Sequence, residues 1–98
     1  MTRIEAIAKL KERVEAVEAR GAVSMYLFGS AARDQAPSDS DLDLFIDYDV
    51  DRKFSLVDLV GIKLFPEDEL GIPVDVTTRD SLHPLLRRDI EKSAVRVF

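Results

Sequence analysis

The chain has 98 residues, 46% of them hydrophobic and 34% charged, and this length and composition predict a single soluble domain over residues 1–98. Fourteen Lys and Arg against 19 Asp and Glu leave a net charge of −5, which argues against direct nucleic-acid binding. The absence of cysteine excludes disulfides, zinc–thiolate sites and thiol nucleophiles. No apolar run approaches the roughly 20 residues of a membrane span, and we expect a cytoplasmic protein with no membrane contact.

The first twenty residues are predicted to form one helix. Thr2, with Glu5 three residues later, forms a capping box at its start, and Gly21 ends it. Apolar residues recur at spacings of three and four and give the helix one apolar face: Ile4, Ile7, Leu10, Val14 and Val17.

A strand is predicted next, over residues 23–28, because this segment is rich in β-forming side chains. It ends at Gly29. Residues 30–33 are a candidate short helix, and residues 34–40, with Pro37 and several small polar side chains, are expected to form a loop.

Residues 41–50 show the most regular pattern in the sequence. Apolar side chains occupy the even positions from Leu42 to Val50, and carboxylates occupy four of the odd positions: Asp41, Asp43, Asp47 and Asp49. A period of two predicts a strand with one apolar and one acidic face. The alternative for these acids is a charged edge strand that resists aggregation, and we assign Asp47 and Asp49 to that role or to solvated positions.

A helix toward Leu70 follows, capped by Ser55 with Asp58 and ended by Gly71. Pro66 is expected to kink or restart it near Phe65.

A strand over residues 73–78 then carries Val74 and Val76 on one face and Asp75 on the other. The last predicted helix begins near Ser81, and the chain closes with a short apolar end at Val95 and Val97. This order of elements predicts an α/β (α+β) fold with a small sheet covered by helices.

In the last helix, Leu85, Leu86 and Ile90 are expected to point inward.

Three acidic residues form the first half of a candidate site. Asp41 and Asp43 are two apart on one strand, so both side chains leave the same face with Cα atoms roughly 6.5–7 Å apart. Carboxylates this close repel each other, and a hard divalent cation such as Mg²⁺ relieves the repulsion. If Asp75 comes from a neighbouring strand, the three acids can hold two metal ions.

Gly29, Ser30 and Arg33 form the other half. A glycine after a strand allows close backbone approach, and a helix start presents N–H groups to an anion. The Ser30 hydroxyl and the Arg33 guanidinium can add hydrogen bonds to phosphate oxygens. The alternatives are a simple helix cap for Ser30 and an ordinary surface arginine for Arg33.

Gly29-Ser30, ten intervening residues, Asp41-Leu42-Asp43 and the later Asp75 together resemble the signature of the polymerase-β nucleotidyltransferase superfamily. The short chain and the Ser40–Leu44 segment resemble its minimal, MNT-type branch. The resemblance implies a small mixed sheet with flanking helices. It also implies that Asp41, Asp43 and Asp75 bind metal and that Gly29 and Ser30 hold a triphosphate.

The resemblance further implies an antitoxin that transfers AMP from ATP, with Mg²⁺, to a hydroxyl of a partner, a HEPN-family RNase toxin. Two alternatives stay open: an antitoxin that acts by binding alone, and a nucleotidyltransferase acting on a small molecule such as an antibiotic. Ala31 and Asp34 stand where the family commonly has a basic residue and a glycine, which favours weaker triphosphate binding.

Three features outside this motif also have alternatives. Phe45 lies on the Asp43 face of its strand. It is predicted either to pack near the nucleotide or to be a core residue that faces a helix. The last helix carries a basic cluster of Arg87, Arg88 and Lys92. It is predicted either to be a solvated helix face or to contact an acidic partner or a nucleotide. His83 is expected to be a turn or surface residue.

Overall fold

A computed structural model of the chain describes residues 2–29, 32, 42–49, 51, 53–71 and 73–98. Its elements follow in the order α1 (Arg3–Lys11), α2 (Val14–Ala19), β1 (Ala22–Phe28), β2 (Leu42–Tyr48), α3 (Leu56–Leu70), β3 (Val74–Thr78), the 3₁₀ turn η1 (Arg79–Ser81), α4 (Pro84–Ser93) and β4 (Val95–Arg96). None of the helices described is long and apolar enough to cross a bilayer. The predicted helix-and-sheet fold is confirmed.

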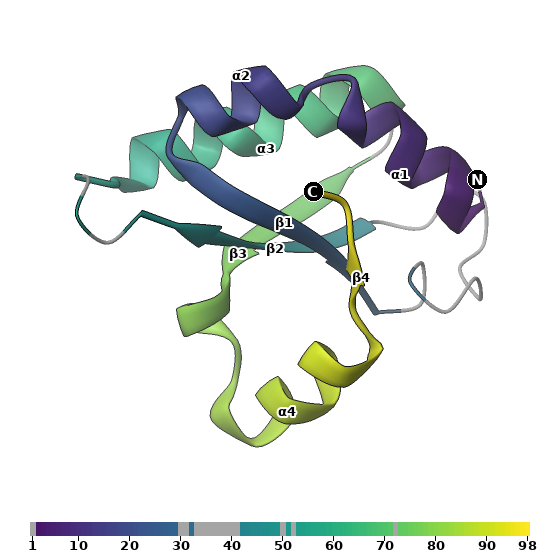
Figure 1. Cartoon of the computed structure of the whole chain (residues 1–98), viewed down its shortest axis with the longest axis vertical. Coiled ribbons are helices and arrows are strands. Elements are labelled where there is room, and N and C mark those ends of the chain that lie inside the picture. Colours follow the sequence, from purple (N-terminus) through teal and green to yellow (C-terminus); the bar gives the residue numbers. More distant parts are fainter. Residues whose placement is uncertain (1, 30–31, 33–41, 50, 52, 72) are drawn as a thin grey trace.

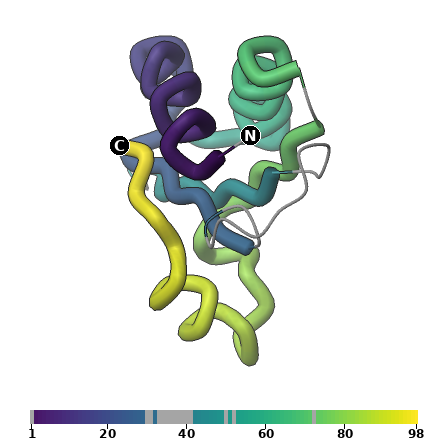
Figure 2. Tube along the Cα trace, turned by 90° about the vertical axis from the view of Figure 1, so that its right-hand side faces the viewer, coloured from purple at the N-terminus to yellow at the C-terminus, as the bar shows by residue number. Residues whose placement is uncertain are grey.

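The four strands form one mixed sheet in the order β3-β2-β1-β4. β1 is antiparallel to β2 and to β4, whereas β2 and β3 are parallel. Helices α1, α2 and α3 lie together on one side of this sheet, and α4 lies on the other (Figures 1 and 2). β2 is an interior strand, so the idea that its acids protect an exposed edge is wrong.

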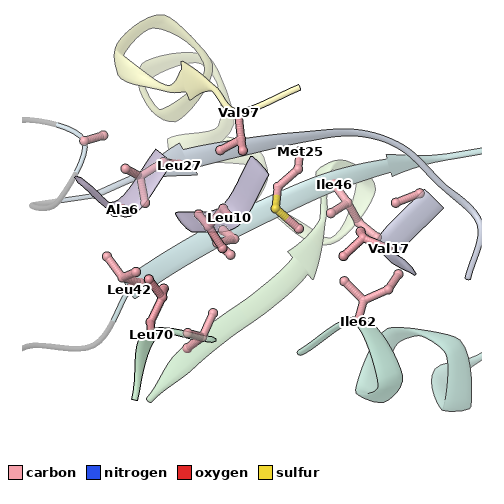
Figure 3. Packing of buried hydrophobic residues seen from close by; sticks show 14 residues of the cluster. Ala6, Leu10, Val17, Met25, Leu27, Leu42, Ile46, Ile62, Leu70 and Val97 are labelled. Atoms are coloured by element: carbon pink, nitrogen blue, oxygen red, sulfur yellow. The ribbon is translucent and has the colours of Figure 1, made fainter. Parts of the chain in front are cut away.

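The core lies between the sheet and helices α1–α3. Leu42, Leu44 and Ile46 alternate along β2 and are buried on this side, as the period of two predicts. Figure 3 shows Leu10, Val17 and Ile62 among the side chains that pack in the same layer. The buried cluster consists of Ala6, Leu10, Val17, Ala22, Met25, Leu27, Ala32, Leu42, Leu44, Ile46, Ile62, Leu70, Val74 and Val97.

The N-terminal segment forms two helices, so the prediction of one continuous helix is wrong. The backbone N–H groups of Glu12 and Arg13 bond to carbonyls three residues back, and Arg13 leaves helical geometry at φ −111° and ψ 13°. The Arg13 side chain also forms an ion pair with Glu69 of α3 at 3.0 Å. Ile4 is 74% exposed, and Ala6 fills the first core position in its place.

Helix α3 runs from Leu56 to Leu70 as one element. Of the two outcomes expected near Phe65, a kink or a restart, the restart is therefore wrong. The predicted cap is confirmed, because the Ser55 side chain accepts from the Asp58 N–H and Asp58 accepts from the Ser55 N–H. Pro66 lies inside the helix and is buried. Packing of α3 against α1 and β3 offsets the hydrogen bond that the proline removes.

Helix α4 departs from its predicted packing. Leu85 is 83% exposed and Leu86 is 55% exposed, so neither points into the core, while Ile90 is half-buried. The cause lies on the sheet face beneath, where the guanidinium of Arg79 lies 5.0 Å from the ring centre of the buried Phe45. Little apolar surface is therefore left for the leucines to cover. His83 is exposed, as expected, and its Nδ1 accepts from the Leu85 N–H.

Leu44→Ala tests the assignment of the core. Leu44 is fully buried on the central strand, so its truncation is expected to lower the free energy of unfolding by about 2–5 kcal/mol. Leu85→Ala, the same change at an exposed position, is expected to alter stability by less than about 0.5 kcal/mol. Urea unfolding measures both variants, and equal losses would contradict the packing described here.

Candidate functional site

The site is built on the parallel pairing of β2 with β3. Asp43 and Asp75 are register partners, as are Leu42 and Val74. Partners in neighbouring strands lie about 4.8 Å apart and point to the same face. Because Leu42 and Val74 are buried toward α1–α3, both acids lie on the opposite face, where Asp43 is half-buried and Asp75 is exposed.

Gly29 adjoins Asp43 from the other side. Phe28, the last residue of β1, pairs with Asp43, and Gly29 follows it with φ +75°. A Cβ atom at Gly29 would lie 2.8 Å from Asp43 Oδ2. Position 29 therefore favours glycine for two physical reasons: the backbone is in the left-handed conformation, and the missing side chain leaves room for the Asp43 carboxylate. The predicted close approach of a ligand to the Gly29 backbone stays a prediction.

Beyond Gly29, the structure describes one residue of the predicted phosphate-binding segment. Ala32 is buried, and its carbonyl accepts a hydrogen bond from Arg3 Nη1 of α1 at 3.1 Å. The N-terminal helix therefore anchors the chain after β1. The remaining predicted residues, Ser30, Arg33 and Asp41, lie outside the described residues, as do the short helix predicted at 30–33 and the loop at 34–40.

The described acids fit a divalent cation by their chemistry. Asp43 and Asp75 supply carboxylate oxygens from adjacent strands, and such oxygens are the donors that Mg²⁺ prefers. Among the described residues no group of three or more acidic or histidine side chains could hold a metal ion. The predicted third ligand, Asp41, precedes Leu42 and therefore lies two residues from Asp43 in the sequence.

An aromatic platform covered by one arginine lies on the same sheet face. Tyr26 and Phe45 stack with ring centroids 4.8 Å apart, and the Arg79 guanidinium lies 4.9 and 5.0 Å from the two centroids. Phe45 is buried beneath this guanidinium, on the sheet face away from α1–α3. Cation–π contacts of this kind strengthen when they are shielded from water.

Two carboxylates hold Arg79 in place. Asp47 accepts from Arg79 Nε at 2.8 Å and from Nη2 at 2.9 Å, and Glu91 of α4 accepts from Nη1 at 2.9 Å. Burial lowers the pKa of Arg79, but its hydrogen bonds and the charge of Asp47 outweigh burial and raise that pKa above its ordinary value. The arginine thus stays charged and joins η1 to β2 and α4.

The prediction of a solvated or edge-protecting role for Asp47 is wrong, since this carboxylate accepts from Ser24 and Arg79. Asp49 is exposed, as expected, and its Oδ1 accepts from the Asp51 N–H. Arg79 was not among the residues predicted from the sequence, and no local pattern links it to Asp47, which lies 32 residues away.

The cationic side chains of α4 only partly match the predicted solvated face. Arg87 pairs with Glu91 at 2.9 Å, whereas Arg88 and Lys92 are exposed. Together with Pro84, these residues line an open hollow of about 530 Å³.

Comparison with known proteins identifies the family. A family described as "Nucleotidyltransferase domain" matches residues 7–97, which is nearly the whole chain. The chain belongs to the nucleotidyltransferase domain family. The predicted enzyme class and the predicted resemblance are thereby confirmed.

Proteins of Methanocaldococcus jannaschii are similar to the chain over most of both sequences. One, named "Putative protein adenylyltransferase MJ0435", is 42% identical over 74% of this chain and 75% of its own length. Another, "Putative protein adenylyltransferase MJ0126", is 33% identical over 89% of this chain and 88% of its own length.

Two solved structures show the same fold. One described as "putative minimal nucleotidyltransferase" is 33% identical, covers 97% of this chain and 95% of its own, and has a TM-score of 0.82. A toxin–antitoxin crystal structure with AMP-PNP is 14% identical with a TM-score of 0.69, covering 90% of this chain and 72% of its own. At that identity the likeness shows the fold alone.

Gly29→Ala tests the contact between Gly29 and Asp43. The new methyl group would lie too close to Asp43 Oδ2, and an alanine at this positive φ is strained. We therefore expect the free energy of unfolding to fall by about 1–3 kcal/mol. Gly71→Ala is the matched control, since Gly71 has φ +68° with no atom within 4 Å of its added Cβ, and it isolates the backbone cost. Urea unfolding that showed no larger loss for Gly29→Ala than for Gly71→Ala would contradict the steric argument.

Proposed function

We propose that this nucleotidyltransferase transfers AMP from ATP to a hydroxyl group on a partner protein. The observation that carries the proposal is the in-register pair of Asp43 and Asp75 beside Gly29. This arrangement puts two carboxylates at the end of β1, beside a glycine that leaves room for one of them. The names of the Methanocaldococcus jannaschii relatives, which specify protein adenylyltransferases, support protein as the acceptor class.

In the proposed reaction the acceptor oxygen attacks the α-phosphorus of ATP. The new oxygen–phosphorus bond forms in line as the α–β phosphoanhydride bond breaks, and pyrophosphate leaves. Asp75 helps to take the proton of the attacking hydroxyl. The more buried Asp43, held between β1 and β3, would supply carboxylate oxygens to the divalent cation that offsets the negative charge of the phosphates.

Asp41, Asp43 and Asp75 are the residues we propose to hold Mg²⁺. When bound, the divalent cation neutralises negative charge on the phosphates and on the attacking oxygen. Gly29, Ser30 and Arg33 are proposed to orient the triphosphate, the first by close backbone approach and the others by hydrogen bonds. The chain itself contributes mainly positioning and charge.

We further propose a HEPN-family RNase toxin as the acceptor, with this chain as its cytoplasmic antitoxin. Its support is the sequence resemblance to minimal nucleotidyltransferases, together with a neighbour of the same fold that comes from a toxin–antitoxin structure. The net charge of −5 supports a protein acceptor over a nucleic acid.

Mass spectrometry of the partner after incubation with the chain, ATP and Mg²⁺ tests the proposal. We expect a mass gain of one or more AMP units, abolished by a chelator. Asp43→Asn and Asp75→Asn are each expected to reduce the rate at least about 100-fold, because they remove a carboxylate from the reacting centre. Asp89→Asn, at an exposed acid on α4, is the matched control and is expected to retain the rate.

Two results would overturn this function. Absence of any mass gain, with toxin neutralisation that survives Asp43→Asn, would establish an antitoxin that acts by binding. AMP transfer to an aminoglycoside in place of the protein would establish a small-molecule enzyme. Equal loss of rate in all three asparagine variants would remove the assigned roles of Asp43 and Asp75.

A further inference from the structure

Helix α3 carries a row of large apolar side chains on its solvent side. Leu56, Val60 and Leu64 are spaced four residues apart and are 74%, 49% and 60% exposed, and Val57 beside them is 73% exposed. We call these four residues the α3 stripe. Apolar side chains scattered singly over a surface are ordinary, but a contiguous row on one helix marks an interaction surface. The opposite face of α3, with Gly61, Ile62 and Pro66, is buried against the rest of the domain.

We propose that the α3 stripe is the interface between two copies of this chain, which pack α3 against α3 in antiparallel orientation about a two-fold axis at Val60. A row at i, i+4 and i+8 is the ridge that packs into the matching groove of a second helix. An interface about a two-fold axis is self-complementary, so a contact between two different residues occurs twice, once on each side of the axis. With Val60 on the axis, Leu56 of each copy meets Leu64 of the other.

Charge at the two ends of the stripe favours this orientation. Lys53 is exposed just before the helix, and Glu67 and the exposed Asp68 lie just beyond Leu64. Glu67 also pairs with Lys63 of its own helix, at 3.6 Å. An antiparallel pair places the lysine of each copy near the acids of the other, and it also opposes the two helix dipoles. A parallel pair would instead bring like charges together. The second copy is thus an occupant whose charges complement the stripe at both ends.

Shape at the first end of the stripe points the same way. A hollow of about 200 Å³ adjoins Leu56 and is lined also by Tyr48, Phe54 and Leu59. Tyr48 and Phe54 stack at 4.8 Å and form its aromatic wall. In the antiparallel pair, Leu64 of the second copy lies beside Leu56, next to this hollow. The two-fold axis repeats the same contact at the hollow of the second copy.

This interface leaves the acidic sheet face open. Helix α3 lies on the side of the sheet opposite α4 (Figure 2). Leu42 and Leu44 are buried on the α3 side, whereas the alternation of β2 and its register with β3 put Asp43 and Asp75 on the other face. The inference therefore does not depend on the proposed function. It predicts a dimer whose two sites both remain accessible.

Sedimentation velocity of the full chain over a concentration series tests the dimer. Val60→Glu puts two like charges on the axis and is expected to raise the dimer dissociation constant at least roughly 30-fold. Leu85→Glu, an equal change at an exposed leucine of α4, is the matched control and is expected to leave it unchanged. Both positions are exposed, and circular dichroism shows whether each variant is folded.

A cysteine at the axis tests the geometry. The chain has no native cysteine, so Val60→Cys provides one thiol per copy. Oxidation is expected to give a covalent dimer with Val60→Cys and none with Leu85→Cys. Lys53→Glu and Glu67→Lys are each expected to weaken the homodimer, whereas a mixture of these two variants restores opposite charges at both ends and is expected to dimerise.

Two results would overturn the inference. The first is a chain that stays monomeric throughout the concentration series, and loss of binding to a partner protein on Val60→Glu would then assign the stripe to that partner. The second is a dimer that Val60→Glu does not weaken, because the interface would then lie elsewhere.

Discussion

The parallel pairing of β2 with β3 is the constraint on which the site depends. Asp43 and Asp75 are 32 residues apart, and only the register of these two strands brings them to one place on one face. The same register carries Leu42 and Val74 into the core, so the position of the acids is fixed by the burial of their neighbours. A slip of one residue in either strand would turn its acid toward the helices and an apolar side chain toward solvent.

The division of the sheet into two faces explains the different packing of the helices. Helices α1–α3 meet the apolar face and contribute buried residues, such as Leu10, Val17 and Ile62. Helix α4 contributes no buried side chain and is joined to the sheet through the ion pair of Glu91 with Arg79. On this second face the contact of α4 with Arg79 is therefore polar, and the guanidinium, in place of an apolar helix face, covers the rings of Tyr26 and Phe45.

Much of this arrangement follows from local pattern. The alternation over residues 42–48 predicts β2 and the face of Asp43, because a half-buried strand must alternate. Ser55 with Asp58 and Gly71 predict both ends of α3 because they satisfy the backbone groups there. The strand carrying Asp75 was predicted, but its placement beside β2 is tertiary, and family resemblance supplied what periodicity did not.

Other features carry no local signal. The break after Lys11 occurs without glycine or proline, and its ion pair joins residues 56 positions apart. The apolar pattern of α4 predicted burial, yet a pattern on one helix says nothing about whether the surface opposite is already covered. Arg79 meets Asp47 across 32 residues, and no spacing rule links them.

The ion pair of Arg79 with Asp47 has a consequence for the electric field of the molecule. The Asp43 face of β2 carries two carboxylates, but the guanidinium compensates the one at Asp47. The charge of this strand face is therefore not the simple sum of its carboxylates. A diffusing ion that passes Asp47 meets an ion pair, whose field decays faster with distance than that of a single carboxylate, so long-range steering from this position is weak.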